Sequence, residues 1–241
     1  MFFIELTVIL FLIMFQSIFG IGLLILGTPT FIAMGYDFKS TLSILLPISI
    51  FISFFQFYKK KISIDKFINK YNVFCIPFLI VFLIISLLIE DSSNLKIYIS
   101  LLLILSSLMM LLKDKFFNYE KVIIKNDKFI LIFIGTVHGF SNMGGNFLSL
   151  FCSIYSKQNK IKTRYFIAYG YLIMGILQYL IIIFFSNFNI DFSKLFYLFL
   201  VLPIYFPAQI IFKNINNNYY LKVINFTALV YGFFILIFYF I

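Results

Sequence analysis

Charged residues are scarce in this sequence. Only 12% of its 241 residues are charged, whereas a soluble globular domain carries about 25%. Hydrophobic residues account for 63% of the chain, and phenylalanine alone occurs 36 times. Because so few charges cannot cover a water-facing surface, the composition excludes a soluble globular protein and indicates one whose solvent is lipid.

Alternation between apolar and polar residues is also missing, which excludes an outer-membrane barrel. The apolar residues form continuous runs instead, and several exceed the roughly 18 residues that indicate a membrane-spanning helix. The sequence therefore predicts an all-α polytopic membrane protein. The apolar segments cover residues 2–35, 40–58, 71–89, 95–112, 129–156, 165–185, 195–212 and 219–241.

Acidic residues are missing from the middle of these segments. All nine, from Glu5 to Asp191, lie in connectors or near segment ends. Cation pathways through membranes usually contain a buried acid, so this distribution favours an anionic or neutral substrate. The sequence also lacks a Walker-type phosphate loop, paired aspartates and a group of metal-binding residues. We therefore expect no enzymatic activity, no catalytic residue, no metal and no cofactor.

The chain is a sequence written twice, in two halves of similar length. The halves match when residue numbers are raised by 122 and, beyond about residue 60, by 126. Duplicated halves are typical of transporters, in which the substrate site lies where the halves meet. We expect a first repeat over 1–112, a basic connector over 113–128 and a second repeat over 129–241. The matched pairs include Gln16 with His138, Gly22 with Gly144, Thr41 with Thr163, Gln56 with Gln178 and Pro77 with Pro203.

The basic residues predict the membrane topology. In a soluble protein the net charge of +10 would suggest nucleic acid as a partner, but here the basic residues lie between apolar segments, so we expect none. Eight simple spans would place eight basic residues on one side of the membrane and eleven on the other. If 2–35 and 129–156 each enter and leave on one side, the division becomes sixteen inside to three outside, as the positive-inside rule expects. Each repeat then keeps three full spans, which turns the second repeat upside down; each in-and-out segment could equally be two short spans.

Glycines interrupt both in-and-out segments, at Gly20 and Gly22 in the first and at Gly144 and Gly145 in the second. Glycine allows a helix to stop and turn inside the membrane. The helix that restarts there offers free N–H groups and a partial positive charge, which form an anion site. Two inverted copies would point two such helix starts at one central site. The alternative role of these glycines is close helix packing.

Polar side chains gather around the glycines. His138, the only histidine, could donate to an anion, carry a proton or bond a backbone carbonyl, whereas its counterpart Gln16 cannot titrate. The amides of Gln56 and Gln178 could contact substrate or hold helices together. Thr41 and Thr163 are expected to cap the helices that follow them. The expected substrate-binding residues are Gln16, Gly20, Gly22, Gln56, His138, Ser141, Asn142, Gly144, Gly145, Asn146 and Gln178.

At these glycine segments the chain resembles the sulfite exporter TauE/SafE family of membrane transporters, whose two halves each open with the form G-I-G-G-G-F. The first copy here is Gly20-Ile21-Gly22-Leu23-Leu24-Ile25, and the second is Asn142-Met143-Gly144-Gly145-Asn146-Phe147. Two glycines of the pattern are replaced in each copy, by leucines in the first and by asparagines in the second. The resemblance implies transport of small anions, with sulfite and organosulfur anions as candidates.

The leading hypothesis is a secondary transporter of a small anion that works by alternating access between two inverted repeats. The anion would lie between the two glycine breaks, with more of its site in the second, more polar repeat. The alternative hypothesis is a non-transporting membrane scaffold or assembly factor. We expect a multi-pass protein of the cell (inner/plasma) membrane, whose partners are the lipid bilayer and a small anionic substrate, with a homodimer as a candidate assembly.

The topology can be tested with a reporter fused after residue 160. Because this connector carries four basic residues, the reporter should read cytoplasmic. A matched fusion after residue 39, in a connector with one lysine, should read exterior. An exterior signal from the fusion at 160 would contradict the predicted topology.

Overall fold

The fold is known from a computed structural model that describes residues 2–58, 66–88, 104, 123–185 and 192–220, with 222, 223, 226, 229 and 233. Every regular element in these residues is a helix. Most of the last apolar segment of each half, 95–112 and 219–241, falls outside them. The elements are α1 (Phe2–Phe19), α2 (Leu23–Ala33), α3 (Phe38–Tyr58), α4 (Lys66–Phe74), α5 (Ile76–Leu88), α8 (Asp127–Ser141), α9 (Gly145–Tyr155), α10 (Lys160–Phe185), η2 (Phe192–Phe196) and α11 (Tyr197–Asn214).

Five helical stretches in the described part of the chain are long and apolar enough to cross a membrane. This finding confirms the predicted all-α polytopic membrane fold. The helices α2 and α9 are apolar but only 11 residues long, too short to cross a bilayer of about 30 Å alone. The five stretches are Phe2–Phe19, Phe38–Tyr58, Lys66–Leu88, Lys160–Phe184 and Lys194–Asn214.

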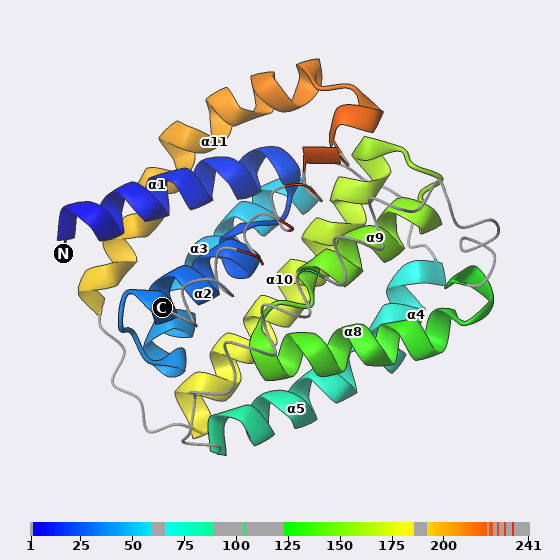
Figure 1. The fold of residues 1–241 in the computed structure, drawn as a ribbon, viewed down its shortest axis with the longest axis horizontal. Coiled ribbons are helices and arrows are strands. Elements are labelled where there is room, and N and C mark those ends of the chain that lie inside the picture. The colour runs from blue at the N-terminus through cyan, green and yellow to red at the C-terminus, as the bar shows by residue number, and fades with distance from the viewer. Residues whose placement is uncertain are drawn as a thin grey trace.

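Each in-and-out segment folds as a broken pair of helices. In Figure 1, α1 runs from the N-terminus toward the middle of the molecule, and α2 returns toward the end from which α1 came. The pair α8 and α9 does the same from the opposite end. Both breaks therefore lie in the middle of the molecule.

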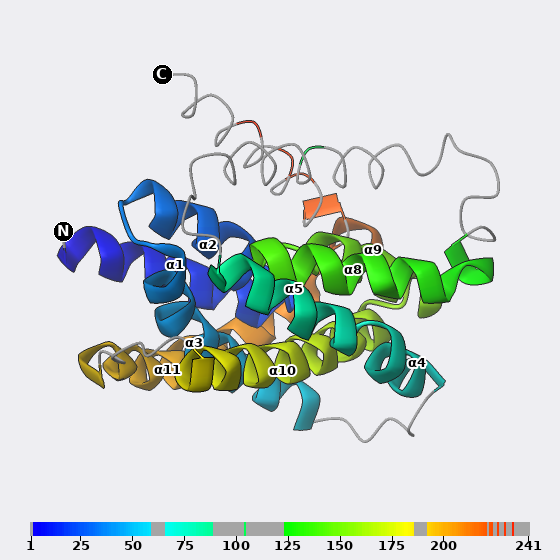
Figure 2. The same ribbon diagram turned by 90° about the horizontal axis from the view of Figure 1, so that it is seen from below.

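The two halves exchange their first helices. Helix α1 packs against α11 of the second half, and α8 packs against α5 of the first half, while α3 and α10 pack against each other through the centre. Figure 2 shows the broken pairs in one layer and α10 with α11 in the layer beneath. In Figure 1, α1 and α8 run in opposite directions, as do α3 and α10. The inverted placement of the halves across a bilayer stays a prediction.

Local backbone conformation repeats at matched positions. Gly20 and Asn142 both have a left-handed backbone, with φ of 80° and 60°. Helices α3 and α10 also begin alike, at the matched residues Asp37 and Asn159. The Asp37 carboxylate accepts the Ser40 N–H at 2.8 Å, and the Asn159 side chain accepts two N–H groups at 3.1 Å. These two residues are the caps.

The prediction that Thr41 and Thr163 cap these helices is wrong. Both lie inside the first turn of their helix, four residues after the true cap. The hydroxyl of Thr163 instead bonds the hydroxyl of Ser156 at 2.5 Å. Asp37 and Asn159 take the capping role because their short side chains stand one position before the helical turn, where the free N–H groups point.

Glycines in α8 allow α8 and α5 to approach closely. A Cβ atom added at Gly135 would lie 2.2 Å from the carbonyl oxygen of Cys75, and one at Gly139 would lie 2.4 Å from that of Leu79. Glycines four residues apart form one face of a helix, where they let two backbones meet in a membrane. The packing between α5 and α8 therefore requires both glycines.

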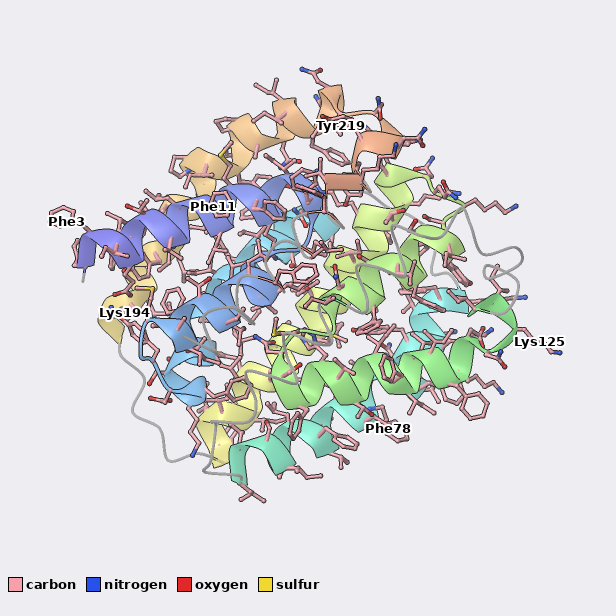
Figure 3. All side chains as sticks on the ribbon, in the orientation of Figure 1. Phe3, Phe11, Phe78, Lys125, Lys194 and Tyr219 are labelled. Carbon is pink, nitrogen blue, oxygen red and sulfur yellow. The ribbon has the colours of Figure 1, made fainter. Side chains whose placement is uncertain are left out.

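Two ion pairs join the halves, and their acidic partners, Glu5 and Asp127, stand at matched positions. Glu5 in α1 accepts two bonds from Lys194, at 2.6 and 2.7 Å, and Asp127 in α8 pairs with Lys70 in α4. Figure 3 shows Lys194 near the end that holds Phe3, while Lys125 marks the opposite end. Tyr36 also donates to Glu5, at 2.9 Å. Burial, together with this bond, raises the pKa of Tyr36 to about 12, so its hydroxyl keeps its proton at neutral pH.

Replacement of Lys194 by Met should destabilise the fold strongly. Glu5 is only 2% exposed, and removal of one partner of a buried ion pair costs about 3 kcal/mol or more. We expect a clearly lower thermal unfolding temperature in detergent, followed by tyrosine fluorescence.

The double variant Lys194→Met with Glu5→Gln should recover most of the loss, because no charge then remains buried. The exposed Lys162→Met serves as the control and should unfold like the wild type. Equal unfolding temperatures for Lys194→Met and Lys162→Met would show that the ion pair does not stabilise the fold.

Candidate functional site

The first break lies between α1 and α2, at Gly20, Ile21 and Gly22. The N–H of Gly20 donates to the carbonyl of Gln16 at 2.7 Å, which closes the last turn of α1. Gly20 and Gly22 have positive φ angles of 80° and 123°, which L side chains rarely adopt. A Cβ atom at Gly22 would also lie 2.2 Å from the ring of Phe15. The turn of this break therefore requires glycine.

The second break lies between α8 and α9. Asn142 ends α8 in a left-handed conformation, and its N–H donates to the carbonyl of His138 at 2.7 Å. Helix α9 restarts at Gly145. A Cβ atom there would lie 1.6 Å from the hydroxyl oxygen of Tyr171, so only glycine lets α9 begin against α10.

The two breaks meet in the protein interior. The side-chain amide of Asn142 donates to the hydroxyl of Thr28 in α2 at 2.9 Å. Ile25, in the first turn of α2, lies against Gly145, the first residue of α9. Neither α2 nor α9 has a side-chain cap bond at its start. Two helix N-termini, each with a partial positive charge, therefore lie close together and away from water.

A polar cluster of the first half surrounds the first break, and we name it the glutamine cluster: Gln16, Ser49, Ser53 and Gln56. The Gln16 amide donates to the hydroxyls of Ser49 and Ser53, at 3.0 and 3.1 Å. The Gln56 amide donates to the backbone carbonyls of Gln16 and Ser17, at 2.8 and 3.3 Å. These bonds fix the end of α1, so Gln56 holds helices together.

The second half has a counterpart, which we name the histidine cluster: His138, Tyr171 and Gln178. These residues match Gln16, Ser49 and Gln56 at the offset of 122. The rings of His138 and Tyr171 meet edge to face with centroids 5.8 Å apart, and Gln178 lies beside His138. All three side chains are fully buried.

The histidine cluster differs from the glutamine cluster in its hydrogen bonds. Within the described residues, His138 and Gln178 lie close enough to interact with each other, but five polar atoms of the cluster make no hydrogen bond of good geometry. They are the two ring nitrogens of His138, the hydroxyl of Tyr171, and the amide nitrogen and oxygen of Gln178. Buried polar groups are nearly always bonded, so this cluster is suited to receive a polar ligand or water.

All eleven residues expected from the sequence to bind substrate are buried. Gln16, Gly20, Gly22 and Gln56 surround the first break, and the other seven surround the second. Ser141 bonds within its own helix, because its hydroxyl donates to the carbonyl of Val137 at 2.7 Å and accepts the N–H of Met143 at 3.3 Å. The structure thus brings the predicted residues together at two adjoining breaks.

Sequence reasoning missed four polar partners of this site, Thr28, Ser49, Ser53 and Tyr171. The offset of 122 pairs Ser49 with Tyr171, so the repeat carried a signal for two of them. Sequence reasoning also counted Arg164 among the basic residues of a water-exposed connector. In the structure Arg164 is buried, with only 6% of its surface exposed. No group of three or more His, Cys, Asp or Glu residues that could hold a metal occurs within the described ranges.

Comparison with known proteins identifies the family. The family model of the sulfite exporter TauE/SafE matches residues 6–236, which is nearly the whole chain. A search of curated proteins and a search of solved structures each found no match. The matched range includes both breaks and both polar clusters. The chain therefore belongs to the sulfite exporter TauE/SafE family, a family of membrane transporters.

Proposed function

We propose that the protein is a secondary transporter of a small anion, with sulfite and organosulfur anions as the candidate substrates. It works by alternating access between two inverted repeats, residues 1–112 and 129–241, which the basic connector 113–128 joins. The anion binds in the interior where the two breaks meet. The protein acts in the cell (inner/plasma) membrane.

The observation that carries this proposal is the histidine cluster with its unpartnered polar atoms. A buried donor or acceptor without a partner costs about 1–3 kcal/mol. His138, Tyr171 and Gln178 can each offer a hydrogen, and no carboxylate lies among the described residues of either cluster. An anion, which only accepts hydrogen bonds, would satisfy the donors. A metal cation would not.

The two helix starts add to this preference for an anion. The N–H groups of Gly145 and Asn146 lie in the first turn of α9, and those of Leu23 and Leu24 lie in the first turn of α2. At a helix start the N–H groups point away from the helix body, and the helix dipole favours negative charge beside them. The two starts lie close together, so both can act on one bound ion.

The two clusters have different roles in this mechanism. The glutamine cluster bonds to itself and to the end of α1, and it therefore keeps the first break in shape. The histidine cluster leaves its groups available for the substrate. Gln16 and Gln56 thus position the break, while His138, Gln178, Asn142 and Asn146 contact the anion.

Anion flux through liposomes tests the proposed function. Purified protein reconstituted in liposomes should move sulfite or a small organic sulfonate faster than empty liposomes, measured with the labelled anion. Sodium and potassium should not be carried without an anion, because the site has no carboxylate. Absence of flux across sulfite, sulfonates, carboxylates and halides would refute anion transport.

Asn146→Leu separates a transporter from a membrane scaffold. The residue that matches Asn146 in the first half is Leu24, so the fold already accepts leucine at this point of a break. Anion flux should fall at least about 10-fold, as expected for one lost hydrogen bond to a charged ligand. The exposed Asn69→Leu is the matched control and should keep wild-type flux.

Protein yield and unfolding temperature should stay near the wild type in both variants. Flux that is unchanged by Asn146→Leu would instead favour a scaffold, in which the breaks serve packing alone.

A further inference from the structure

A second polar site lies outside the two breaks. A cavity of about 430 Å³ opens between the end of α3, the start of α10 and the end of α11. Its lining includes the polar side chains of Gln56, Arg164 and Gln209 and the aromatic rings of Tyr205 and Phe212. Its size falls within the range of about 300–1,000 Å³ typical of small-molecule sites.

Arg164 is the main charged group of this cavity. The guanidinium donates from Nη2 to the Gln209 side-chain oxygen at 2.6 Å and lies 4.0 Å from the ring centre of Phe212. The hydroxyl of Tyr205 also interacts with it. Its second terminal nitrogen, Nη1, is buried and has no hydrogen-bond partner within the described part of the chain.

No described carboxylate neutralises Arg164. Glu5 is paired with Lys194, Asp127 is paired with Lys70, and Asp37 caps α3 through Ser40. A buried charge without a counter-charge is expensive, and proteins compensate it with an ion of opposite sign. Within the described residues Arg164 therefore has no counter-charge, and it is suited to bind an anion.

The surroundings of Arg164 increase the positive potential. Arg164 lies in the second turn of α10, where the positive end of the helix dipole disfavours a cation. Lys160 and Lys213 also line the cavity. Lys160 donates to the carbonyls of Phe212 and Lys213, at 3.0 and 3.1 Å, so its charge stays fixed at the end of α11.

The cavity adjoins the back of the first break. Gln209 donates to the carbonyl of Ser17 at 3.2 Å, and Gln56 donates to that of Gln16. A Cβ atom at Gly20 would lie 3.1 Å from the Arg164 side chain. The cavity and the break thus share the walls that Gln56 and Gln209 form.

From these observations we infer that the cavity is an oxyanion-binding site, with Arg164 as its charged ligand, on the basic side of the membrane. This inference rests on the proposed anion transport. It adds a second binding site for the same anion, beside the first break. Nη1 of Arg164 binds an oxygen of a sulfonate, sulfite or carboxylate group. The rings of Tyr205 and Phe212 cover a small organic body attached to that group.

Binding of methanesulfonate and sulfite to the purified protein in detergent, measured by calorimetry, tests the inference. Arg164→Gln should weaken binding about 10- to 100-fold, the loss expected for a charged hydrogen-bonding group. Gln209→Glu should have the same effect for a different reason, because its carboxylate would neutralise Arg164 in place of the anion. This second variant keeps side-chain size and the bond to Arg164, so it remains informative if Arg164→Gln fails to fold.

Lys162→Gln is the matched control, because it removes an exposed positive charge two residues before Arg164 in α10. It should bind both anions as the wild type does. Wild-type affinity in Arg164→Gln or in Gln209→Glu would overturn the inference.

Flux measured in parallel separates this site from the transport proposal. If the wild type carries anions and the two variants bind and carry them equally well, the cavity site is refuted and transport stands. If the wild type binds methanesulfonate through Arg164 but carries no anion, transport is refuted and the site stands. A wild type that neither binds nor carries these anions would refute both.

Discussion

A helix that ends inside a bilayer leaves carbonyl groups that only the protein can satisfy. The end of α1 shows how this constraint shapes the structure. Gln56 of α3 and Gln209 of α11 donate to its last carbonyls, and Tyr220 donates to that of Phe19. These donors come from both halves of the chain. The break between α1 and α2 can exist only because the second half folds against the first.

The two breaks solve this constraint differently, and the difference favours one of them for function. The residue that matches Gln209 in the first half is Leu83, which cannot donate to the end of α8. Both ends close with a left-handed residue whose own N–H bonds back to the helix, Gly20 in the first break and Asn142 in the second. Among the described residues, Gln56, Gln209 and Tyr220 donate to the end of α1. Near the end of α8 the corresponding bond is a long one, from Ser86 to the carbonyl of Gly139 at 3.4 Å, and the polar atoms of His138, Tyr171 and Gln178 remain without a close bond. The duplicated sequence has thus produced one break whose polar side chains bond to the protein, and a second break where several polar atoms lack a close bond.

The sequence allowed prediction of the helical membrane fold, both breaks and the residues around them, because long apolar runs and glycines repeated at matched positions are compatible with few other structures. The caps of α3 and α10 were mispredicted, since threonine and a preceding Asp37 or Asn159 are all good capping residues and only geometry chooses among them. Arg164 could not be distinguished from its neighbours. Whether a side chain in the first turns of a helix faces water or protein depends on α11, which comes from a distant part of the chain.

The exchange of first helices has a consequence for biosynthesis. Ribosomes deliver α1 well before α11, yet these two helices pack together and share the ion pair of Glu5 with Lys194. Glu5 must therefore enter or border the membrane long before its counter-ion exists. During that interval the acid has to stay at the water interface, or protonated, or shielded by other membrane components. Synthesis of Lys194 and α11, rather than insertion of the first half, fixes the position of α1.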